Sequence, residues 1–329
     1  MNKIQTLQTT EKQINQAEFV KINGIQQFIY HQGSHYDNPV ILHLHGGPGN
    51  PFSNKAYLLE SWSPYFTMVY YDQRGAGKTA IRNPETKPSF QHMIEDIHEL
   101  ILYLKRKYNK AKIGILAHSW GTMIGSIYAQ QFPEHLAFYI GVGQVIAPVQ
   151  NEKKSYQEMI QRLYASKDEK RLKRLENLGR YPGETPAEFL RKMGTFRKLQ
   201  VELGMCVDNK KKNLAWIKQS PLFSEEDLLA PQLSAQMLTE LLEEIFYFDL
   251  VDSSPAYHIP IYYLLGKKDW QVPTCLAVEY FNQIKAPDKK LVVIDDAMHE
   301  PMLEKPDAFL QAMRDVVNRQ GGEEEIVQD

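Results

Sequence analysis

The sequence predicts an α/β protein in which a doubly wound, mostly parallel sheet carries an inserted, all-helical cap. Two observations predict this fold class. Between residues 40 and 146, short apolar runs alternate with segments of helical periodicity, which is typical of βα units in a parallel sheet. Over residues 147–257 the pattern becomes helical and polar, and the alternation then resumes. We therefore expect a core made of residues 1–146 and 258–329, with residues 147–257 as the cap.

Composition narrows the class of protein. The chain has 329 residues, of which 43% are hydrophobic and 24% charged, and its formal net charge is −2. This composition can bury a large core, and it lacks the basic excess of a nucleic-acid-binding protein. No apolar run approaches the roughly 18 residues of a membrane span, and residues 1–19 hold no apolar segment of a signal peptide. We expect a cytoplasmic protein without nucleic-acid or membrane partners.

The sequence holds two cysteines, Cys206 and Cys275. Two cysteines exclude a disulfide framework, and in a chain of this kind both are expected to be buried free thiols. They cannot form a zinc site alone, and no H-E-x-x-H spacing adds ligands. The sequence therefore implies neither a metal nor a cofactor.

The first predicted elements are a hairpin and two buried strands. Alternating residues over 18–31 flank the dipeptide Asn23-Gly24, which is the strongest short signal for a β-hairpin. The apolar runs 40–44 and 66–71 are typical of buried strands, and residues 56–62 between them are predicted to be helical.

A long helix comes next, and Ser89 is its predicted N-cap. A strand over 113–116, a helix over 120–131 and a strand over 138–145 follow. Apolar residues at helical spacing predict the long helix: Met93, Ile94, Ile97, Ile101 and Leu104.

The last predicted elements complete the core. Strands over 261–265 and 291–294 alternate with helices over 276–284 and 306–317. The final helix has Pro306 in its first turn, where proline is favoured.

Charge is divided unevenly within the predicted cap. Residues 151–218 hold 17 Lys and Arg against 9 Asp and Glu, whereas residues 219–257 hold 8 Asp and Glu and no Lys or Arg. We expect two solvated helical faces that attract one another. The alternative is that some of the acidic residues face a cleft and attract a cationic substrate group.

Ser119 occupies the turn between the strand over 113–116 and the helix over 120–131. The local pattern x-x-S-x-G is that of a nucleophile elbow, although Ala117 stands where the motif usually has its first glycine. The helix N-terminus would face negative charge that develops at the serine. Ser119 is therefore the candidate nucleophile.

A serine nucleophile needs a base, and the base needs a carboxylate. In this strand–turn–helix context the chain order is serine, acid, histidine. Asp269 and His299 follow the strands over 261–265 and 291–294, so both are expected at the carboxyl edge of the sheet. Asp295 and Asp296 are rival acids, and we rank them lower because the acid conventionally comes from the preceding loop.

A glycine-rich run, HGGPG at residues 45–49, follows the strand over 40–44. An oxyanion hole takes one N–H from such a loop and one from the residue after the nucleophile. This nominates Gly47, with Gly46 as its neighbour, and Trp120. His45 is expected to be a structural hydrogen-bonding residue.

A second loop, DQRGAG at residues 72–77, follows the strand over 66–71. Its glycines resemble a phosphate loop only superficially, because the spacing is wrong. We expect Arg74 to be structural and to pair with a carboxylate or with loop carbonyls beneath the site.

Together these motifs resemble the proline iminopeptidase branch of the α/β-hydrolase superfamily. The resemblance rests on HGGPG, DQRGAG, Ser119-Trp120-Gly121 and the pair Asp269 and His299, and it covers residues 18–146 and 258–318. It implies a serine peptidase that releases N-terminal residues, often proline, beneath a helical cap, with an oxyanion hole at Gly47 and Trp120.

The resemblance also implies that glutamates of the cap hold the amino group of a small-molecule or short-peptide substrate. In the family one of these glutamates lies in a Trp-Glu segment, and the nearest match here is Glu202, without the tryptophan. Glu240, Glu243 and Glu244 are the alternatives.

Other functions stay open at this point. A carboxylesterase or lipase-like hydrolase uses the same three residue types, and a non-catalytic binding protein on the same fold is a further alternative. A complete set of Ser119, Asp269 and His299 disfavours a pure binding role. A dehalogenase or epoxide hydrolase is disfavoured because the elbow residue is a serine.

Overall fold

The structure, a computed structural model, describes residues 13–207, 210–251 and 255–319. The sheet in this part of the chain has eight strands in the order β1-β2-β4-β3-β5-β6-β7-β8. The pairs β1–β2 and β2–β4 are antiparallel, and every other pair is parallel. The strands are β1 (Ile14–Ile22), β2 (Ile25–Gly33), β3 (Val40–Leu44), β4 (Thr67–Tyr71), β5 (Ile113–His118), β6 (Leu136–Val142), β7 (Ile261–Gly266) and β8 (Lys289–Ile294).

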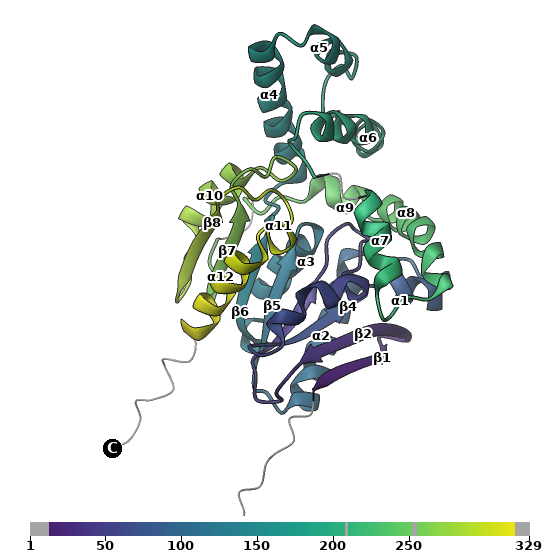
Figure 1. Ribbon diagram of the computed structural model, residues 1–329, viewed down its shortest axis with the longest axis vertical. Coiled ribbons are helices and arrows are strands. Elements are labelled where there is room, and N and C mark those ends of the chain that lie inside the picture. Colours follow the sequence, from purple (N-terminus) through teal and green to yellow (C-terminus); the bar gives the residue numbers. More distant parts are fainter. Residues whose placement is uncertain (1–12, 208–209, 252–254, 320–329) are drawn as a thin grey trace, which may run out of the picture.

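Helices lie on both faces of the sheet, as the alternation of strands and helices predicts (Figure 1). One apolar layer packs α2, α3 and α10 against the strands, and the other packs η1 and α12 against the opposite face. The helices of the core are η1 (Ser53–Trp62), α1 (Gly77–Arg82), α2 (Phe90–Tyr108), α3 (Trp120–Gln131), η2 (Pro133–His135), α10 (Thr274–Gln283), α11 (Pro301–Glu304) and α12 (Pro306–Asn318).

The predicted fold class is confirmed, and the elements differ mainly at their ends. Asn23 and Gly24 both have positive φ, 45° and 85°, as the tight turn of the predicted hairpin requires. The strand expected over 138–145 ends at Val142, because Gly143 turns the chain with φ 53°. The segment expected to be helical over 56–62 is a longer 3₁₀ helix, η1.

The chain between β6 and β7 is helical wherever the structure describes it, apart from loops and an isolated bridge at Ala256. Figure 1 shows two parts, which we call the distal helices and the proximal helices. The distal helices project away from the sheet, and the proximal helices lie beside α1 and the core. The distal helices are α4 (Pro148–Ser166), α5 (Glu169–Glu176) and α6 (Pro186–Glu202). The proximal helices are α7 (Lys210–Gln219), η3 (Glu225–Leu229), α8 (Ala230–Glu240) and α9 (Leu242–Tyr247).

The ion pairs of these two parts show how some of their charges are balanced. In the part of the chain that the structure describes, four arginines of the distal helices, Arg162, Arg171, Arg174 and Arg197, pair with carboxylates of the same helices and of the loop before α5. Acidic residues of η3 and α8 pair with core lysines, through Lys78–Asp227 and Lys87–Glu240. The expected attraction between the basic and acidic parts of the cap stays a prediction.

In the part of the chain that the structure describes, no helix combines the length and the apolar character that crossing a bilayer would need.

Candidate active site

Ser119 lies on a sharp turn where β5 ends and α3 begins. Its φ is 53°, an uncommon backbone conformation for a residue other than glycine, and its N–H donates to the Val142 carbonyl at 2.8 Å. The turn is possible because α3 comes very close to β3. A Cβ added at Gly121 would lie 2.2 Å from the Leu44 carbonyl oxygen, so this position requires glycine. The serine side chain is thereby presented at the carboxyl edge of the sheet.

Ala117 occupies the place of the usual first glycine of the motif. It is fully buried at the end of β5, facing α3. The helix accommodates its methyl group because residue 125 is a glycine, and a Cβ there would lie 3.2 Å from the Ala117 Cβ. The methyl group of Ala117 on β5 thus lies against the position on α3 where Gly125 has no side chain.

The loops after β7 and β8 bring an acid and a histidine to Ser119. His299 Nε2 lies 2.9 Å from Ser119 Oγ, and His299 Nδ1 lies 2.7 Å from Asp269 Oδ2. The second carboxylate oxygen of Asp269 accepts the N–H groups of Gln271 and Val272, each at 2.9 Å. This chain of hydrogen bonds can hold the imidazole in the tautomer that accepts a proton from the serine.

The surroundings of His299 set its proton affinity. Burial favours the neutral imidazole, but the nearby Asp269 carboxylate outweighs it, and the pKa of His299 is raised above its ordinary value of 6.5. The ring fits only because residue 143 is a glycine, since a Cβ there would lie 2.7 Å from His299 Cε1.

The rival acids face away from this site. Asp295 and Asp296 are exposed, and they pair with Lys267 at 2.8 Å and Lys268 at 2.6 Å. Of the three candidate carboxylates, only Asp269 contacts His299 in the structure.

The residues nominated for an oxyanion hole lie beside Ser119. Gly47 has φ 127°, and Trp120 is the first residue of α3. Within the described residues, neither backbone N–H donates to a protein acceptor. A Cβ at the neighbouring Gly46 would lie 3.2 Å from Ser119 Cβ, so the loop passes directly over the serine. Both amides are thus available to an oxygen bound at the serine.

A buried network fixes the glycine loop to α3. His45 Nδ1 bonds the Gly46 carbonyl at 2.8 Å, and His45 Nε2 accepts the Gln73 N–H at 3.2 Å. The Gln73 side chain donates to the His45 carbonyl and accepts from Trp120 Nε1. Burial lowers the pKa of His45 to about 4, so its ring is neutral. In the adjacent loop, Arg74 makes two hydrogen bonds of 2.8 Å to the Asp96 carboxylate.

Two cavities meet at Ser119, and Gly47, Arg197 and Gln271 line both. The first, the Trp120-side cavity, has a volume of about 230 Å³ and mostly apolar walls that include Met123, Phe189, Met193 and Ile245. The second, the His299-side cavity, has a volume of about 250 Å³ and walls of mixed polar and apolar character that include Asn50, Cys206, Asn213, His299 and Glu300.

The Trp120-side cavity ends in a buried polar cluster that the sequence prediction missed. Glu152 on α4 is 3% exposed and accepts hydrogen bonds from the Tyr181 hydroxyl and the Arg197 guanidinium. Asn151 is equally buried, and its Oδ1 has no partner within the described residues. A sequence signal exists, because Glu152 belongs to the buried stripe of α4 with Ser155, Met159 and Leu163.

The glutamates nominated for substrate binding lie outside both cavities. Glu202 is bound by Arg171 and Arg174 between α5 and α6, and these bonds lower its pKa to about 2. Glu243 is exposed. The Glu244 carboxylate accepts the Phe90 N–H at the start of α2, at 3.0 Å.

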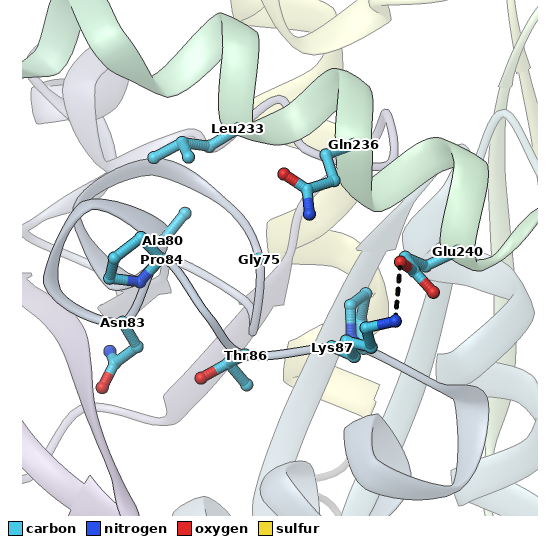
Figure 2. Close-up of a pocket in the computed structure, with 10 residues that line it drawn as sticks. Gly75, Ala80, Asn83, Pro84, Thr86, Lys87, Leu233, Gln236 and Glu240 are labelled. Carbon is cyan, nitrogen blue, oxygen red and sulfur yellow. Dashed lines mark ion pairs between the residues drawn. The ribbon is translucent and has the colours of Figure 1, made fainter.

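Glu240 belongs to a different place, shown in Figure 2. It pairs with Lys87 at 3.4 Å beside a small cavity of about 20 Å³ between α8 and the loop after α1. This contact ties α8 to the core.

Within residues 13–207, 210–251 and 255–319, no group of three or more His, Cys, Asp or Glu side chains is arranged to hold a metal ion.

Comparison with known proteins defines the class. The chain belongs to the α/β-hydrolase fold family, whose description matches residues 39–306. Within that family it is similar to the proline iminopeptidase-like branch. It is 26% identical over 313 residues to a probable aminopeptidase, YbaC, of Bacillus subtilis, covering 92% of this chain and 96% of that protein. It is 24% identical over 284 residues to a proline iminopeptidase of Heyndrickxia coagulans, covering 85% and 90%.

Solved structures agree on the fold. A proline iminopeptidase-related protein from Thermus thermophilus superposes with a TM-score of 0.63 at 18% identity, covering 92% of this chain and 97% of that one. A bacterial membrane phospholipase A superposes with a TM-score of 0.64, also at 18% identity, covering 94% and 87%. Because proteins with different names match equally well, these similarities define the fold and not the substrate.

Proposed function

We propose that the protein is a serine hydrolase and, more narrowly, an aminopeptidase that releases N-terminal residues. Ser119 Oγ attacks the scissile carbonyl while His299 Nε2, 2.9 Å away, takes its proton. Asp269 stabilises the imidazolium that forms. The N–H groups of Gly47 and Trp120 receive the negative oxygen, and water then hydrolyses the acyl-enzyme by the reverse proton path.

The position of His299 assigns a role to each cavity. In acyl transfer the histidine hands its proton to the leaving group, so the leaving group must lie on the histidine's side. His299 lines only the cavity named after it, and Trp120, an oxyanion donor, lines only the other. The Trp120-side cavity therefore receives the acyl part of the substrate, and the His299-side cavity receives the leaving group.

The observation that carries the aminopeptidase proposal is the buried Glu152 in the acyl cavity. Its carboxylate has about four lone-pair sites, of which Tyr181 and Arg197 use one each. Asn151 Oδ1 adds an acceptor without a partner in the described part of the chain. A substrate ammonium carries three donors and a positive charge, which match these acceptors. Glu152 thus takes the role that the sequence analysis gave to Glu202.

The relatives support the same reading. The Bacillus and Heyndrickxia proteins are named as an aminopeptidase and a proline iminopeptidase, and the chain covers at least 90% of each. An ester has no ammonium for Glu152 to bind, so nothing in the acyl cavity specifically favours a carboxylesterase.

The test compares prolyl and alanyl naphthylamides with their N-acetylated forms. A hydrogen bond to a charged group contributes about 1.5–3 kcal/mol, which corresponds to about ten- to a hundredfold in kcat/KM. We expect the wild type to prefer the free amine by that factor and Glu152→Gln to lose most of the preference. Glu202→Gln is the matched control, because it removes a cap carboxylate outside both cavities.

A second variant keeps the test informative if Glu152→Gln folds poorly. Asn151→Leu removes a neutral amide, and with it the Oδ1 acceptor, and we expect it to reduce the preference by a smaller factor. Equal turnover of free and acetylated substrates, or faster turnover of simple acyl esters, would replace the aminopeptidase with an esterase.

A further inference from the structure

Among the described residues that line both the acyl cavity and the leaving-group cavity, Arg197 is the one with a charged side chain. We propose that it binds a free carboxylate on the leaving group, so that the preferred substrates are dipeptides, which carry this carboxylate on their second residue. The inference rests on the proposed aminopeptidase function and deepens it, because it names the chemistry of the departing product.

The guanidinium of Arg197 uses only some of its N–H donors in hydrogen bonds to described protein groups. It donates to Glu152 with one terminal nitrogen and to the Gln200 side chain with the other. A guanidinium has five N–H donors, so three of them have no protein partner within the described residues. The side chain projects from α6, is 27% exposed and lines both cavities.

The leaving-group cavity suits a polar product. Its walls carry the side chains of Asn50, Asn213 and Gln271, and Val201 and Val207 are its aliphatic side chains. The Oδ1 atom of Asn213 is buried and has no partner in the described part of the chain. At about 250 Å³ this cavity is smaller than most small-molecule sites, which measure about 300–1,000 Å³. A single amino acid fits this size and polarity better than a long peptide.

An acidic residue, Glu300, also lines the leaving-group cavity. The Glu300 carboxylate lines the same wall, and it would repel a substrate carboxylate if its charge were not offset. Glu300 acts on the buried Lys55, whose pKa burial lowers and Glu300 raises in part. The buried Lys55 therefore lies near enough to offset part of the Glu300 charge, and Arg197 supplies a guanidinium among the residues that line this cavity.

The ion pair between Arg197 and Glu152 matches a zwitterion. When the substrate ammonium binds Glu152, it supplies a second cation to that carboxylate, and the guanidinium is left with a charge that a substrate carboxylate can satisfy. In a dipeptide the carboxylate is one Cα away from the scissile nitrogen. In a tripeptide it is a further ~3.3–3.6 Å along the chain, beyond a residue placed next to Ser119.

The experiment holds the N-terminal residue constant and varies the leaving group. The substrates are Pro-Ala with a free carboxylate, Pro-Ala amide, and Pro-Ala-Ala, and product release is measured by amine labelling. We expect the wild type to prefer Pro-Ala over its amide by at least tenfold in kcat/KM, and to cleave the tripeptide more slowly than the dipeptide.

The variants test whether Arg197 is responsible. Arg197→Gln should bring the ratio of acid to amide within about twofold, and Arg197→Lys should leave an intermediate ratio, because it keeps the charge but loses the fork. Arg174→Gln is the control, since Arg174, on α5, is bound to Glu202 and lines neither cavity. The ratio is the readout because Arg197→Gln also leaves Glu152 without its partner and lowers both rates.

The outcomes separate the two proposals. Equal rates with Pro-Ala and its amide in the wild type, or an unchanged ratio in Arg197→Gln, overturn the dipeptide inference alone when prolyl naphthylamide is cleaved. If the wild type cleaves no substrate with a free amine, the proposed aminopeptidase function itself fails. Should Arg197→Gln not fold, the wild-type ratio and Arg197→Lys still decide the question.

Discussion

The sheet core and the distal helices contribute differently to the site around Ser119. Core residues come from the ends of β5, β7 and β8, and backbone and side-chain hydrogen bonds within the core hold them. The distal helices bring Glu152 and Arg197, which form an ion pair with one another. The distal helices contact the core through hydrogen bonds that include those from Ser155 and Gln200 to the Trp270 carbonyl, at 2.5 and 2.7 Å.

Under the proposed function, the core therefore holds the residues that break the bond, and the distal helices hold the residues that select the substrate. Residues fixed by the sheet are positioned whatever substrate is present, whereas under the proposed function the polar cluster on α4 and α6 distinguishes one substrate from another. Variants in the core should therefore lower turnover of every substrate, and variants in the distal helices should change the ratios between substrates. The predictions below start with the core.

The largest effect is expected for Ser119→Ala. Removing a triad nucleophile costs about 10⁶-fold in kcat in a well-studied serine protease, because the triad acts as a unit. We expect a loss of several orders of magnitude on all substrates, with the melting temperature little changed. A fluorophosphonate probe should label the wild type and not the variant. Labelling of both to the same extent would remove Ser119 as the nucleophile.

Asp269→Asn should follow, with a loss of about 10³- to 10⁴-fold in kcat. The amide keeps the size of the side chain but favours the wrong histidine tautomer. Asp295→Asn and Asp296→Asn are controls, because these exposed carboxylates contact Lys267 and Lys268 instead of His299. If a control variant loses activity as Asp269→Asn should, the acid comes from the loop after β8.

The pH profile of kcat/KM is expected to report His299. Its pKa is raised, and the reaction needs the neutral ring, so activity should fall as the pH drops through a midpoint above 6.5. His45 and His118 cannot cause this limb, because burial lowers the pKa of each to about 4. Asp269→Asn should move the midpoint to lower pH, since the carboxylate that most opposes the effect of burial is then gone. A midpoint near 4 in the wild type would contradict the assignment.

A smaller effect should come from the contact between the distal helices and the acid loop. Gln200→Leu removes a neutral hydrogen bond to the carbonyl of Trp270, the residue after Asp269, and such a bond contributes about 0.5–1.5 kcal/mol. It also removes the acceptor of one Arg197 N–H group. We expect kcat/KM to fall about two- to tenfold. Gln283→Leu is a matched control, because the exposed amide of Gln283 donates to a carbonyl of its own helix, α10. Equal effects of the two would show that the contact does not bear on the site.

The proximal helices should affect stability more than activity. Lys78 and Asp227 are mostly buried and 2.7 Å apart, so Lys78→Met is expected to lower the free energy of unfolding by about 2 kcal/mol. Lys87→Met breaks an exposed pair at 3.4 Å and should cost below about 0.5 kcal/mol. Urea denaturation measures both. Equal losses would mean that burial of the first pair does not matter.

Much of the core could be predicted from the sequence because its signals are local. Apolar runs predict the parallel strands, and Asn23-Gly24 predicts the hairpin. The predicted order of Ser119, Asp269 and His299 along the chain placed each after a strand, and parallel strands bring such loops to one edge. Their catalytic role stays a proposal.

The polar cluster could not be identified in the same way. Glu152 is one of several cap glutamates, and what distinguishes it is burial against Tyr181 and Arg197, residues 29 and 45 positions away along the chain. Glu202 resembles the family pattern locally, but Arg171 and Arg174 hold it on the outside of the distal helices. Only tertiary contacts decide which carboxylate faces the substrate.

The arrangement of two cavities that meet at Ser119 has a kinetic consequence. Once the leaving group departs from the His299 side, the acyl group remains in the other cavity, and the space beside the histidine is open to the next nucleophile. Water is one such nucleophile, and a free amino acid that fits the same cavity is another. Under the proposed mechanism the acyl-enzyme partitions between hydrolysis and transfer, and at high concentration of an added amino acid new dipeptides should accumulate alongside the hydrolysis product.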